Sequence, residues 1–593
     1  MGIAIRNLFL SFISEVILKL TSFTGRSVLV ALMAVTLAVT TARTQDQPQR
    51  RSGPRDWSHS HVIATRFGPD ADQRLTRDWR TIRKHVQIDD SRVVRNHHSD
   101  ILEMVRERLM PKSKPAADDS HLDWNLRTGG YGSVVGFPAK YSFDVSASNC
   151  ADVIYFTVDQ PGSATAVNVI AITNAYPGCP GNVGGVNPTV KWGIRMGTGT
   201  ATSAVPSLDG KVLYVIESRT TANGGMILHA INVDNITTNP GVYNFGTTNW
   251  TSTHTLAAPS GTATSEQLFQ LTFSTVFNNT SSPFLDYSTN QLFFGDSAGR
   301  MHRVINVNST TASSDAAYNF QCGTAALSSP VFIDATDQLL FTSANGFMYR
   351  IATATAPLAC IASQQGGSGI TVGGAGSTPV IDVTNDKVLV GTNDIVGTGG
   401  RAIGTWPVLF TAGQGPTSFI SLGAGSTTIA PQSPSFDDAF WSTNSGNLYA
   451  AGAPAAGAGT YLLKLPYNGN VLGAASGFAT LARTGAAASV ATSPVTEFLT
   501  ASSLPNPDFI FVGGGSATYK FMNRIASNFA GTNAVPVPVA NSFAPAEGVI
   551  SGIVIDTRTT LITGSTATAN IYFGTVGVAG TTQSTIVQLA QQF

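Results

Sequence analysis

Short apolar runs separated by polar turns recur along most of the chain. Residues 328–351 show the pattern in full, as SPVFID, then QLLFTSA, then Asn345-Gly346, then FMYRI. Proline is tolerated where a strand begins, and Asn-Gly favours a tight hairpin. The stretch therefore predicts an inner strand, an apolar second strand, a hairpin and a third strand.

The same unit repeats through residues 121–593. Its proline lies 47 to 60 residues from the next, with one wider interval of 77, at Pro206, Pro283, Pro330, Pro379, Pro434 and Pro494. Two degenerate copies flank these six, one beginning AKYSFDV and the other containing SGIVIDT. Periods of this length with several short strands each indicate the blades of a β-propeller.

The eight units predict an all-β fold, an eight-bladed β-propeller, with seven blades as the alternative. The last unit ends at Phe593 after three strands. LDWNLRTGG, which contains Trp124, matches VKWGIRMG, which contains Trp192 and is expected to be the outer strand of the first blade. We therefore expect LDWNLRTGG to be the missing outer strand of the last blade. That pairing joins the two ends of the array and removes a sheet edge.

Composition separates this array from what precedes it. Of 35 Lys and Arg residues, 20 lie before residue 131, whereas only 14 of 35 Asp and Glu do. The shift predicts a boundary between a charged segment, residues 43–120, and the propeller, residues 121–593. The net charge of zero gives no global field that would favour nucleic acid, and no stretch after the N-terminal region is long and apolar enough to span a bilayer.

Residues 1–42 have the features of an export signal. Basic residues precede an apolar stretch at 27–42, which ends in Thr-Thr-Ala. An uncleaved N-terminal anchor is the alternative, because the leading region is itself apolar. We expect a secreted or periplasmic protein.

The charged segment predicts two short amphipathic helices, at 75–82 and 99–109, within a partly disordered stretch. It also carries five histidines, and a metal site is one interpretation of them. Solvated surface histidines are the simpler one, since adjacent side chains in a loop diverge. These histidines are His59, His61, His85, His97 and His98.

The four cysteines are candidates for structural disulfides in an exported chain. Cys150 lies between the first and second strands of its blade, and Cys179 between the third and fourth. These two connections lie on the same face of an up-and-down sheet, so this pair is our first prediction. Cys322 and Cys360 fall in outer strands of consecutive blades, where the gap to be bridged is wider.

The Ser-Pro…strand…Asn/Asp-Gly…strand pattern resembles the repeats of the pyrroloquinoline-quinone-type (quinoprotein-alcohol-dehydrogenase-like) propeller superfamily. FPAKYSFDV, the first cysteine pair and TSAVPSLDGKVLYVIES are most similar to uncharacterised secreted bacterial propeller proteins. The quinone enzymes of the superfamily imply adjacent cysteines, a tryptophan platform and clustered carboxylates that hold calcium. This chain has no adjacent cysteines, and only four Glu follow residue 130. We therefore expect no cofactor, no metal site and no catalytic residue.

Several polar residues recur in the units. Aspartates end the inner strands at Asp209, Asp286, Asp334 and Asp382. A ring of carboxylates could bind cations, but Asp side chains commonly cap the turn that follows them, and we favour capping. Equivalent third-strand positions hold His229 and His302, and also Arg303 and Arg350, which packing explains.

The pattern as a whole favours a non-catalytic binding or scaffold protein. Its expected partner is a protein or glycan bound through propeller loops, and we expect a monomer. The insertion at about 235–280 is the predicted recognition loop, because long loops on rigid scaffolds often carry function. The alternative is a quinone- or metal-dependent oxidoreductase that uses the propeller channel.

Overall fold

The structure is a computed structural model, and it describes only part of the chain. Described are residues 63–64, 120–127 and, within 136–592, the strands and many of the turns between them. The chain divides into two compact units, Met1–Ser52 and Gly53–Phe593, and every described residue belongs to the second. The predicted export signal and the two predicted helices lie outside the described residues.

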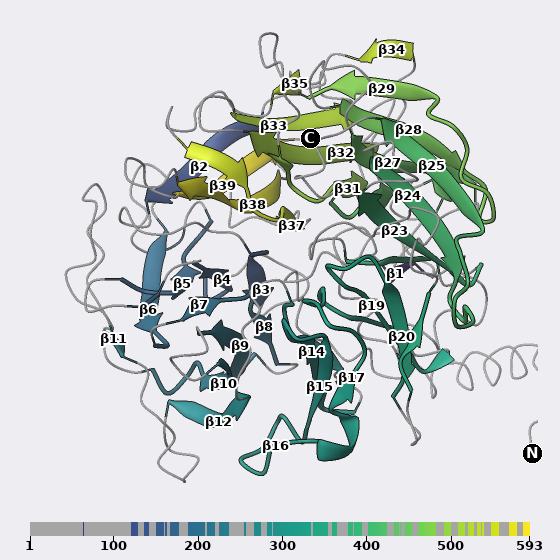
Figure 1. The fold of residues 1–593 in the computed structure, drawn as a ribbon. Coiled ribbons are helices and arrows are strands. Elements are labelled where there is room, and N and C mark those ends of the chain that lie inside the picture. The colour runs from purple at the N-terminus through teal and green to yellow at the C-terminus, as the bar shows by residue number, and fades with distance from the viewer. Residues whose placement is uncertain are drawn as a thin grey trace, which may run out of the picture. The chain divides into compact units, whose positions relative to one another are not determined.

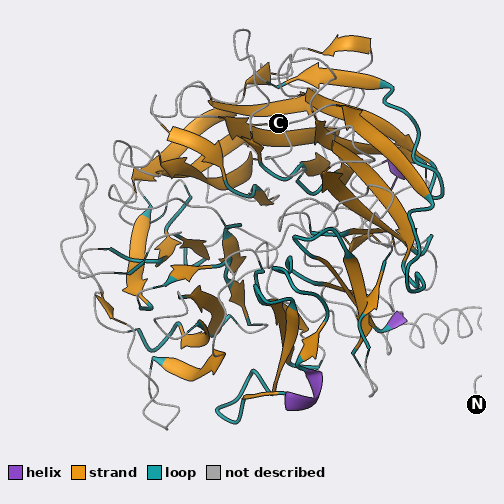
Figure 2. Ribbon diagram, in the orientation of Figure 1, coloured by secondary structure: helices purple, strands orange, loops and turns teal. Residues whose placement is uncertain are grey.

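The described strands form eight sheets, here numbered in chain order, and strands are nearly all of their regular structure (Figure 2). Sheets 1 to 4 consist of the following strands. Sheet 1 has β3 (Ala139–Tyr141), β4 (Val153–Thr157), β5 (Val169–Thr173), β6 (Thr189–Arg195) and β11 (His254–Thr255). Sheet 2 has β7 (Thr200–Ala201), β8 (Val205–Pro206), β9 (Val212–Ser218), β10 (Met226–Asn232) and β12 (Gln267–Phe273). Sheet 3 has β13 (Phe284–Asp286), β14 (Gln291–Gly295), β15 (Arg300–Ile305), β16 (Ser313–Ser314) and β17 (Phe320–Gln321), with the 3-10 turn η2 (Ala316–Tyr318). Sheet 4 has β18 (Val331–Ile333), β19 (Gln338–Thr342), β20 (Met348–Ala352) and β21 (Ile361–Ala362).

Sheets 5 to 8 continue the series. Sheet 5 has β1 (Ile63–Ala64), β22 (Val380–Asp382), β23 (Lys387–Asn393), β24 (Arg401–Pro407) and β25 (Ser418–Gly423). Sheet 6 has β26 (Ser435–Phe436), β27 (Gly446–Gly452), β28 (Tyr461–Tyr467), β29 (Gly477–Thr480) and β34 (Gly531–Ala534). Sheet 7 has β30 (Ala491–Thr492), β31 (Thr496–Leu499), β32 (Asp508–Gly515), β33 (Lys520–Ala526) and β35 (Val537–Pro538). Sheet 8 has β36 (Glu547–Ile550), β37 (Val554–Asp556), β38 (Thr568–Gly577), β39 (Thr585–Gln592) and β2 (Ser120–Arg127).

Within each sheet the successive strands pair antiparallel, as the apolar-polar pattern predicts. SPVFID, QLLFTSA and FMYRI supply β18, β19 and β20, and Gly346 adopts a left-handed φ of 93° in the hairpin between the last two. The predicted closure is also confirmed. β2 runs antiparallel to β39 as the outer strand of sheet 8, with Leu126 opposite Ile586 (Figure 1).

Apolar side chains pack each sheet against the next. Buried clusters join sheet 1 to 2, 2 to 3, 3 to 4, 4 to 5, 5 to 6 and 6 to 7. Sheet 7 contacts sheet 8 through β32 and β36. A further cluster packs Leu126 and Tyr572 of sheet 8 on Ile154 of sheet 1. The contacts thus return to their start, and the all-β fold is a β-propeller.

A buried hydroxyl supports the start of the inner strand in five sheets. It lies three residues before that strand's first paired residue and accepts the backbone N–H of a residue near the end of the second strand. The pairs, donor first, are Ile216 to Thr202, Gly295 to Ser281, Thr342 to Ser328, Gly513 to Ser493 and Gly574 to Ser551, at 2.7 to 3.4 Å. This structural role explains the Ser or Thr that recurs three residues before the inner strand.

The predicted insertion proves shorter than 235–280. Gln267–Phe273 within that range is β12, the regular outer strand of sheet 2, because its alternating apolar residues pack on β10. The residues before it add β11 in parallel to the outer edge of sheet 1, where His254 lies opposite Ile194. In the same way, β34 adds to the outer edge of sheet 6. Parts of two long connections therefore cover sheet edges.

Candidate functional site

The inner-strand aspartates that the structure describes cap turns, in agreement with the sequence prediction. Asp286 accepts the backbone N–H and the hydroxyl of Thr289, at 3.2 and 2.5 Å. Asp382 accepts the backbone N–H and the side-chain amide of Asn385, at 3.1 and 2.5 Å. Asp209 and Asp334 lie outside the described residues.

Both cysteine pairs are joined as disulfides. Cys150–Cys179 links the first–second and third–fourth connections of sheet 1, with a Cα–Cα distance of 5.4 Å. Cys322–Cys360 links the outer strands of sheets 3 and 4, with a Cα–Cα distance of 5.3 Å. The wider gap expected for the second pair is absent, because the chain before β21 approaches the end of β17.

A buried polar cluster lies where β9 of sheet 2 ends and its hairpin begins. The Glu217 side chain is fully buried and binds four donors. Arg219 donates to both of its carboxylate oxygens, at 2.7 and 2.9 Å. The Gly199 backbone N–H donates at 2.8 Å, and His229 Nε2 lies 2.9 Å from the second oxygen. The connection from sheet 1 passes so close that a methyl group on Gly197 would overlap this carboxylate.

Charge and hydrogen bonding keep Glu217 ionised. Burial is the largest single influence and acts to raise its pKa, but the hydrogen bonds from His229, Arg219 and the Gly199 N–H, together with the electrostatic effect of His229, leave the pKa lowered overall. A charged carboxylate at this depth costs free energy unless it is paired and hydrogen-bonded. The cluster therefore fixes three segments of chain around one carboxylate, namely the sheet 1 connection, β9 and β10.

The network extends outward through His229. Its Nδ1 lies 2.8 Å from Oε1 of Gln267, at the start of β12. Gln267 is itself within 3.5 Å of Gln270. Since both ring nitrogens of His229 face oxygen atoms, the ring donates to both only as an imidazolium. The predicted packing role of His229 thus includes a hydrogen bond to Glu217 in β9 and another to Gln267 in β12.

Sheet 3 repeats the arrangement with a shorter acid. Asp296 follows β14 and accepts the backbone N–H groups of Ala298 and Arg300, at 2.9 and 2.8 Å. His302 Nε2 lies 2.9 Å from its other oxygen. The His302 ring stacks on Phe294 and contacts Phe273 of sheet 2, and its buried Nδ1 has no partner. Sequence reasoning found the two histidines but missed their acids; the signal was a carboxylate at the end of the preceding strand.

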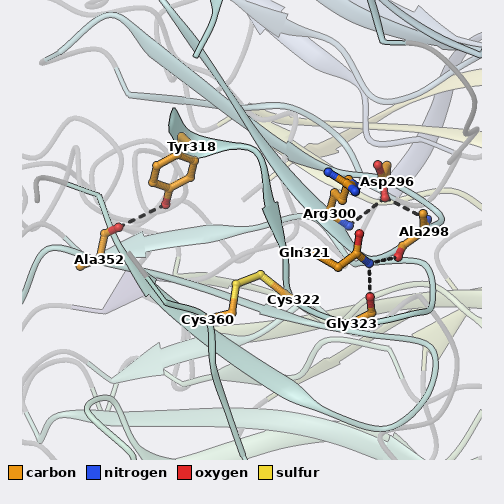
Figure 3. Close-up of a disulfide and its surroundings, with 9 residues drawn as sticks. All are labelled: Asp296, Ala298, Arg300, Tyr318, Gln321, Cys322, Gly323, Ala352 and Cys360. Carbon is orange, nitrogen blue, oxygen red and sulfur yellow. Dashed lines mark hydrogen bonds between the residues drawn. A yellow bond between two sulfur atoms is a disulfide. The ribbon is translucent and has the colours of Figure 1, made fainter. Parts of the chain in front are cut away.

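The hairpin of sheet 3 also lies beside the second disulfide (Figure 3). Cys322 donates its backbone N–H to Gly299 in the hairpin, at 2.9 Å. The Gln321 side-chain amide donates to the carbonyl of Ala298 at 2.5 Å, and also to that of Gly323. The covalent link to sheet 4 is thereby coupled to the hairpin that Asp296 organises.

The arginines named from the sequence pair with neighbouring segments. Arg303 binds Asp315 and the Thr353 carbonyl of sheet 4. Arg350 donates to the Phe410 carbonyl of sheet 5 at 2.6 Å, and burial lowers its pKa. Both therefore connect adjacent sheets.

We call the described residues at the second–third strand hairpins of sheets 2 and 3, namely Arg219, Gly225 and residues 296–299, the hairpin face. Phe273 lies opposite Met226, the residue that begins β10 after the first hairpin, and its ring contacts Phe294 and His302 on either side of the second hairpin. The hairpin ends of sheets 2 and 3 therefore lie at the same end of the propeller. Arg219, whose side chain is 24% exposed, carries charge from the buried cluster to the surface.

The chemistry available in the described part of the chain is limited. No group of three or more His, Cys, Asp or Glu side chains suited to a metal ion occurs among the described residues. The superfamily resemblance implies clustered carboxylates that hold calcium. The two acid–histidine pairs do not form such a cluster, because their polar atoms are bound to backbone groups, to Arg219 and to Gln267. Within the same residues, no helix is both long and apolar enough to cross a membrane.

Comparisons with known proteins identify no function for the chain. No protein family and no curated protein matches the chain. Among solved structures, the C-terminal WD40 domain of Sif2 is 9% identical, with a TM-score of 0.41, over 80% of this chain and 99% of that domain. The Dos1 propeller is 8% identical, with a TM-score of 0.45, over 80% of this chain and 95% of that one. Saccharomyces cerevisiae Sqt1 is 11% identical, with a TM-score of 0.43, over 81% and 100%. Such identities transfer no ligand, partner or activity.

Proposed function

We propose that the protein is an exported, non-catalytic β-propeller, with one blade per sheet, that binds a protein partner through its hairpin face. The observation that carries this proposal is the use made of Glu217 and Asp296. Each buried acid is bound to a histidine and to backbone N–H groups of its own chain. Acids held in this way fix the described ends of the two hairpins, and loops positioned by a rigid scaffold are suited to recognition.

Export is supported by the cysteines. Both disulfides join separate segments, and such bridges persist in oxidising compartments. The apolar, basic-flanked residues 1–42 supply the matching signal. A monomer fits this proposal, because one chain supplies the contacts that return from sheet 8 to sheet 1.

Arg219 provides the test. The full mature chain and its Arg219→Glu variant are immobilised, and partners from the secreted or envelope fraction are cross-linked, identified and then purified for titration. We expect the identified partner to bind the wild-type chain at least about tenfold more tightly, because reversing a charge at an interface costs free energy. The matched control is Lys191→Glu. Lys191 is an exposed charge near the start of β6, at the end of the sheet away from the hairpin face.

Two results would contradict the proposal. One is a partner whose affinity is unchanged by Arg219→Glu. The other is turnover of a defined substrate by the purified chain that is abolished by replacing one described histidine.

A further inference from the structure

Sheet 5 differs from its neighbours at its inner edge. In the other sheets, the inner strand is the last strand on that side among the described residues. In sheet 5, the two residues of β1 pair in parallel with β22, with Ile63 opposite Ile381 and Ala64 opposite Asp382. A segment from far upstream thus lies on the edge where every other sheet ends.

The inner edge of β22 is built to receive a strand. Val380 packs into the cluster shared with sheet 6, and Ile381 into the cluster shared with sheet 4. Asp382 is fully buried and is held by Asn385 and by Tyr467 of sheet 6, at 2.5 and 2.9 Å. With its side chains fixed on both faces and β23 on one edge, β22 presents the backbone groups of its other edge in a fixed geometry.

The pairing partner is short and covalently attached. β1 lies in the stretch HVIATRF, whose Val, Ile and Thr favour extended backbone. Residues 65–119 connect it to β2, which is fixed in sheet 8. Two paired residues form a weak ladder, but attachment makes the pairing intramolecular and raises the effective concentration of the segment.

From these observations we propose that the inner edge of β22 is a strand-addition site for an extended peptide, which Ile63–Ala64 fills as a tethered competitor. This site lies in sheet 5 and not on the hairpin face of sheets 2 and 3, so the inference adds a second binding site to the proposed function. Recognition is through main-chain hydrogen bonds, with preference for β-branched residues, as in other cases where a peptide adds a strand to a sheet edge. An incoming peptide binds when β1 leaves.

The test uses the full chain with two matched double variants. Ile63→Pro with Ala64→Pro removes both amide donors, so the pairing is lost whichever amide faces β22. Ile63→Val with Ala64→Val keeps both donors and favours extended backbone. The probe is a fluorescent peptide of residues 59–67, HSHVIATRF, and its binding is followed by anisotropy. The control peptide has proline at the two positions that correspond to 63 and 64.

We expect the proline variant to bind the probe at least about tenfold more tightly than the valine variant, because the tethered competitor is gone. Neither protein should bind the control peptide. Hydrogen exchange at Val380–Asp382 should be faster in the proline variant and slow again when the probe is added. Equal affinity of the two variants, or unchanged exchange, would overturn the proposal.

Two further outcomes have distinct meanings. Concentration-dependent association of the wild-type chain that the proline pair abolishes would overturn the proposal, since the edge would then be filled by another copy. A failure of the probe to bind while Arg219→Glu still weakens partner binding would overturn this inference and leave the proposed function standing. Circular dichroism of both variants verifies that the propeller is folded.

Discussion

The hydroxyl of Tyr467 donates a 2.9 Å hydrogen bond to Asp382, across the boundary between sheets 6 and 5. Both residues are buried. Burial, with the nearby Asp382 carboxylate, raises the pKa of Tyr467, so this hydroxyl remains a donor over the physiological range. The inner strand of sheet 5 is thus held by the neighbouring sheet at the residue that pairs with Ala64.

Removing this donor should weaken the boundary. Tyr467→Phe keeps the ring packing on Phe436 and Phe440 but leaves the buried Asp382 with one donor fewer. We expect a loss of about 1 to 3 kcal/mol in the free energy of unfolding, measured by denaturant titration. A double-mutant cycle with Asp382→Ala, which removes the acceptor, isolates the pair, and additive losses would contradict a direct coupling.

The buried hydroxyls that precede the inner strands give a second prediction. Ser281→Ala leaves the buried N–H of Gly295 without its acceptor and removes the donor to the Ser328 carbonyl of sheet 4. We expect a loss of about 1 to 3 kcal/mol in the free energy of unfolding. Ser314→Ala in β16 is the control, since Ser314 is exposed. Equal effects of the two substitutions on the denaturation midpoint would contradict the role given to Ser281.

The strand order within each sheet was predictable from sequence because the same pattern recurs in every unit. Strand starts, apolar runs and hairpins recur in each unit, and Trp124 and Trp192 mark matching outer strands, so β2 could be assigned to the last sheet. β1 could not be assigned in this way, because two residues without periodicity carry too little pattern to indicate a strand. Its segment was instead expected to be helical or disordered.

The site was less predictable than the fold. His229 and His302 share a register position that the sequence shows, but the distance to the acid differs. Glu217 precedes its histidine by twelve residues and Asp296 by six, partly because the hairpin of sheet 2 is longer and partly because Glu217 lies within β9 whereas Asp296 follows β14. A contact that crosses a hairpin of variable length has no fixed spacing, so folding alone brings these pairs together.

The disulfides provide a third prediction. They enclose chain segments of similar length, with sequence separations of 29 and 38 residues. Loop-closure entropy then predicts that each contributes about 4 kcal/mol to the free energy of unfolding. We expect the double serine variants of Cys150–Cys179 and Cys322–Cys360 to lower the thermal midpoint by similar amounts under non-reducing conditions. Peptide mapping without reductant verifies both linkages, and swapped partners would contradict them.

The last prediction concerns how the contribution of Glu217 to the free energy of unfolding depends on pH. Its pKa in the folded protein is lowered from an ordinary value of 4.5. As pH falls, Glu217 is therefore protonated in the unfolded chain before it is protonated in the folded protein. The contribution of the carboxylate to the free energy of unfolding is complete above pH 4.5 and declines as pH falls toward the folded-state pKa. Glu217→Gln removes the charge that Arg219 and His229 bind, and should cost about 2 kcal/mol near pH 7.

The dependence of that cost on pH distinguishes a charge effect from a packing effect. Denaturant titrations at a series of pH values should show the gap between wild type and Glu217→Gln widest near neutrality and narrower below pH 4.5, as the wild-type carboxylate protonates. Asp234→Asn, at an exposed position in the same unit, is the control, because an exposed carboxylate contributes little to stability. A gap that stays constant from neutral to acidic pH would mean that shape alone, and not the ionised carboxylate, holds the sheet 2 hairpin.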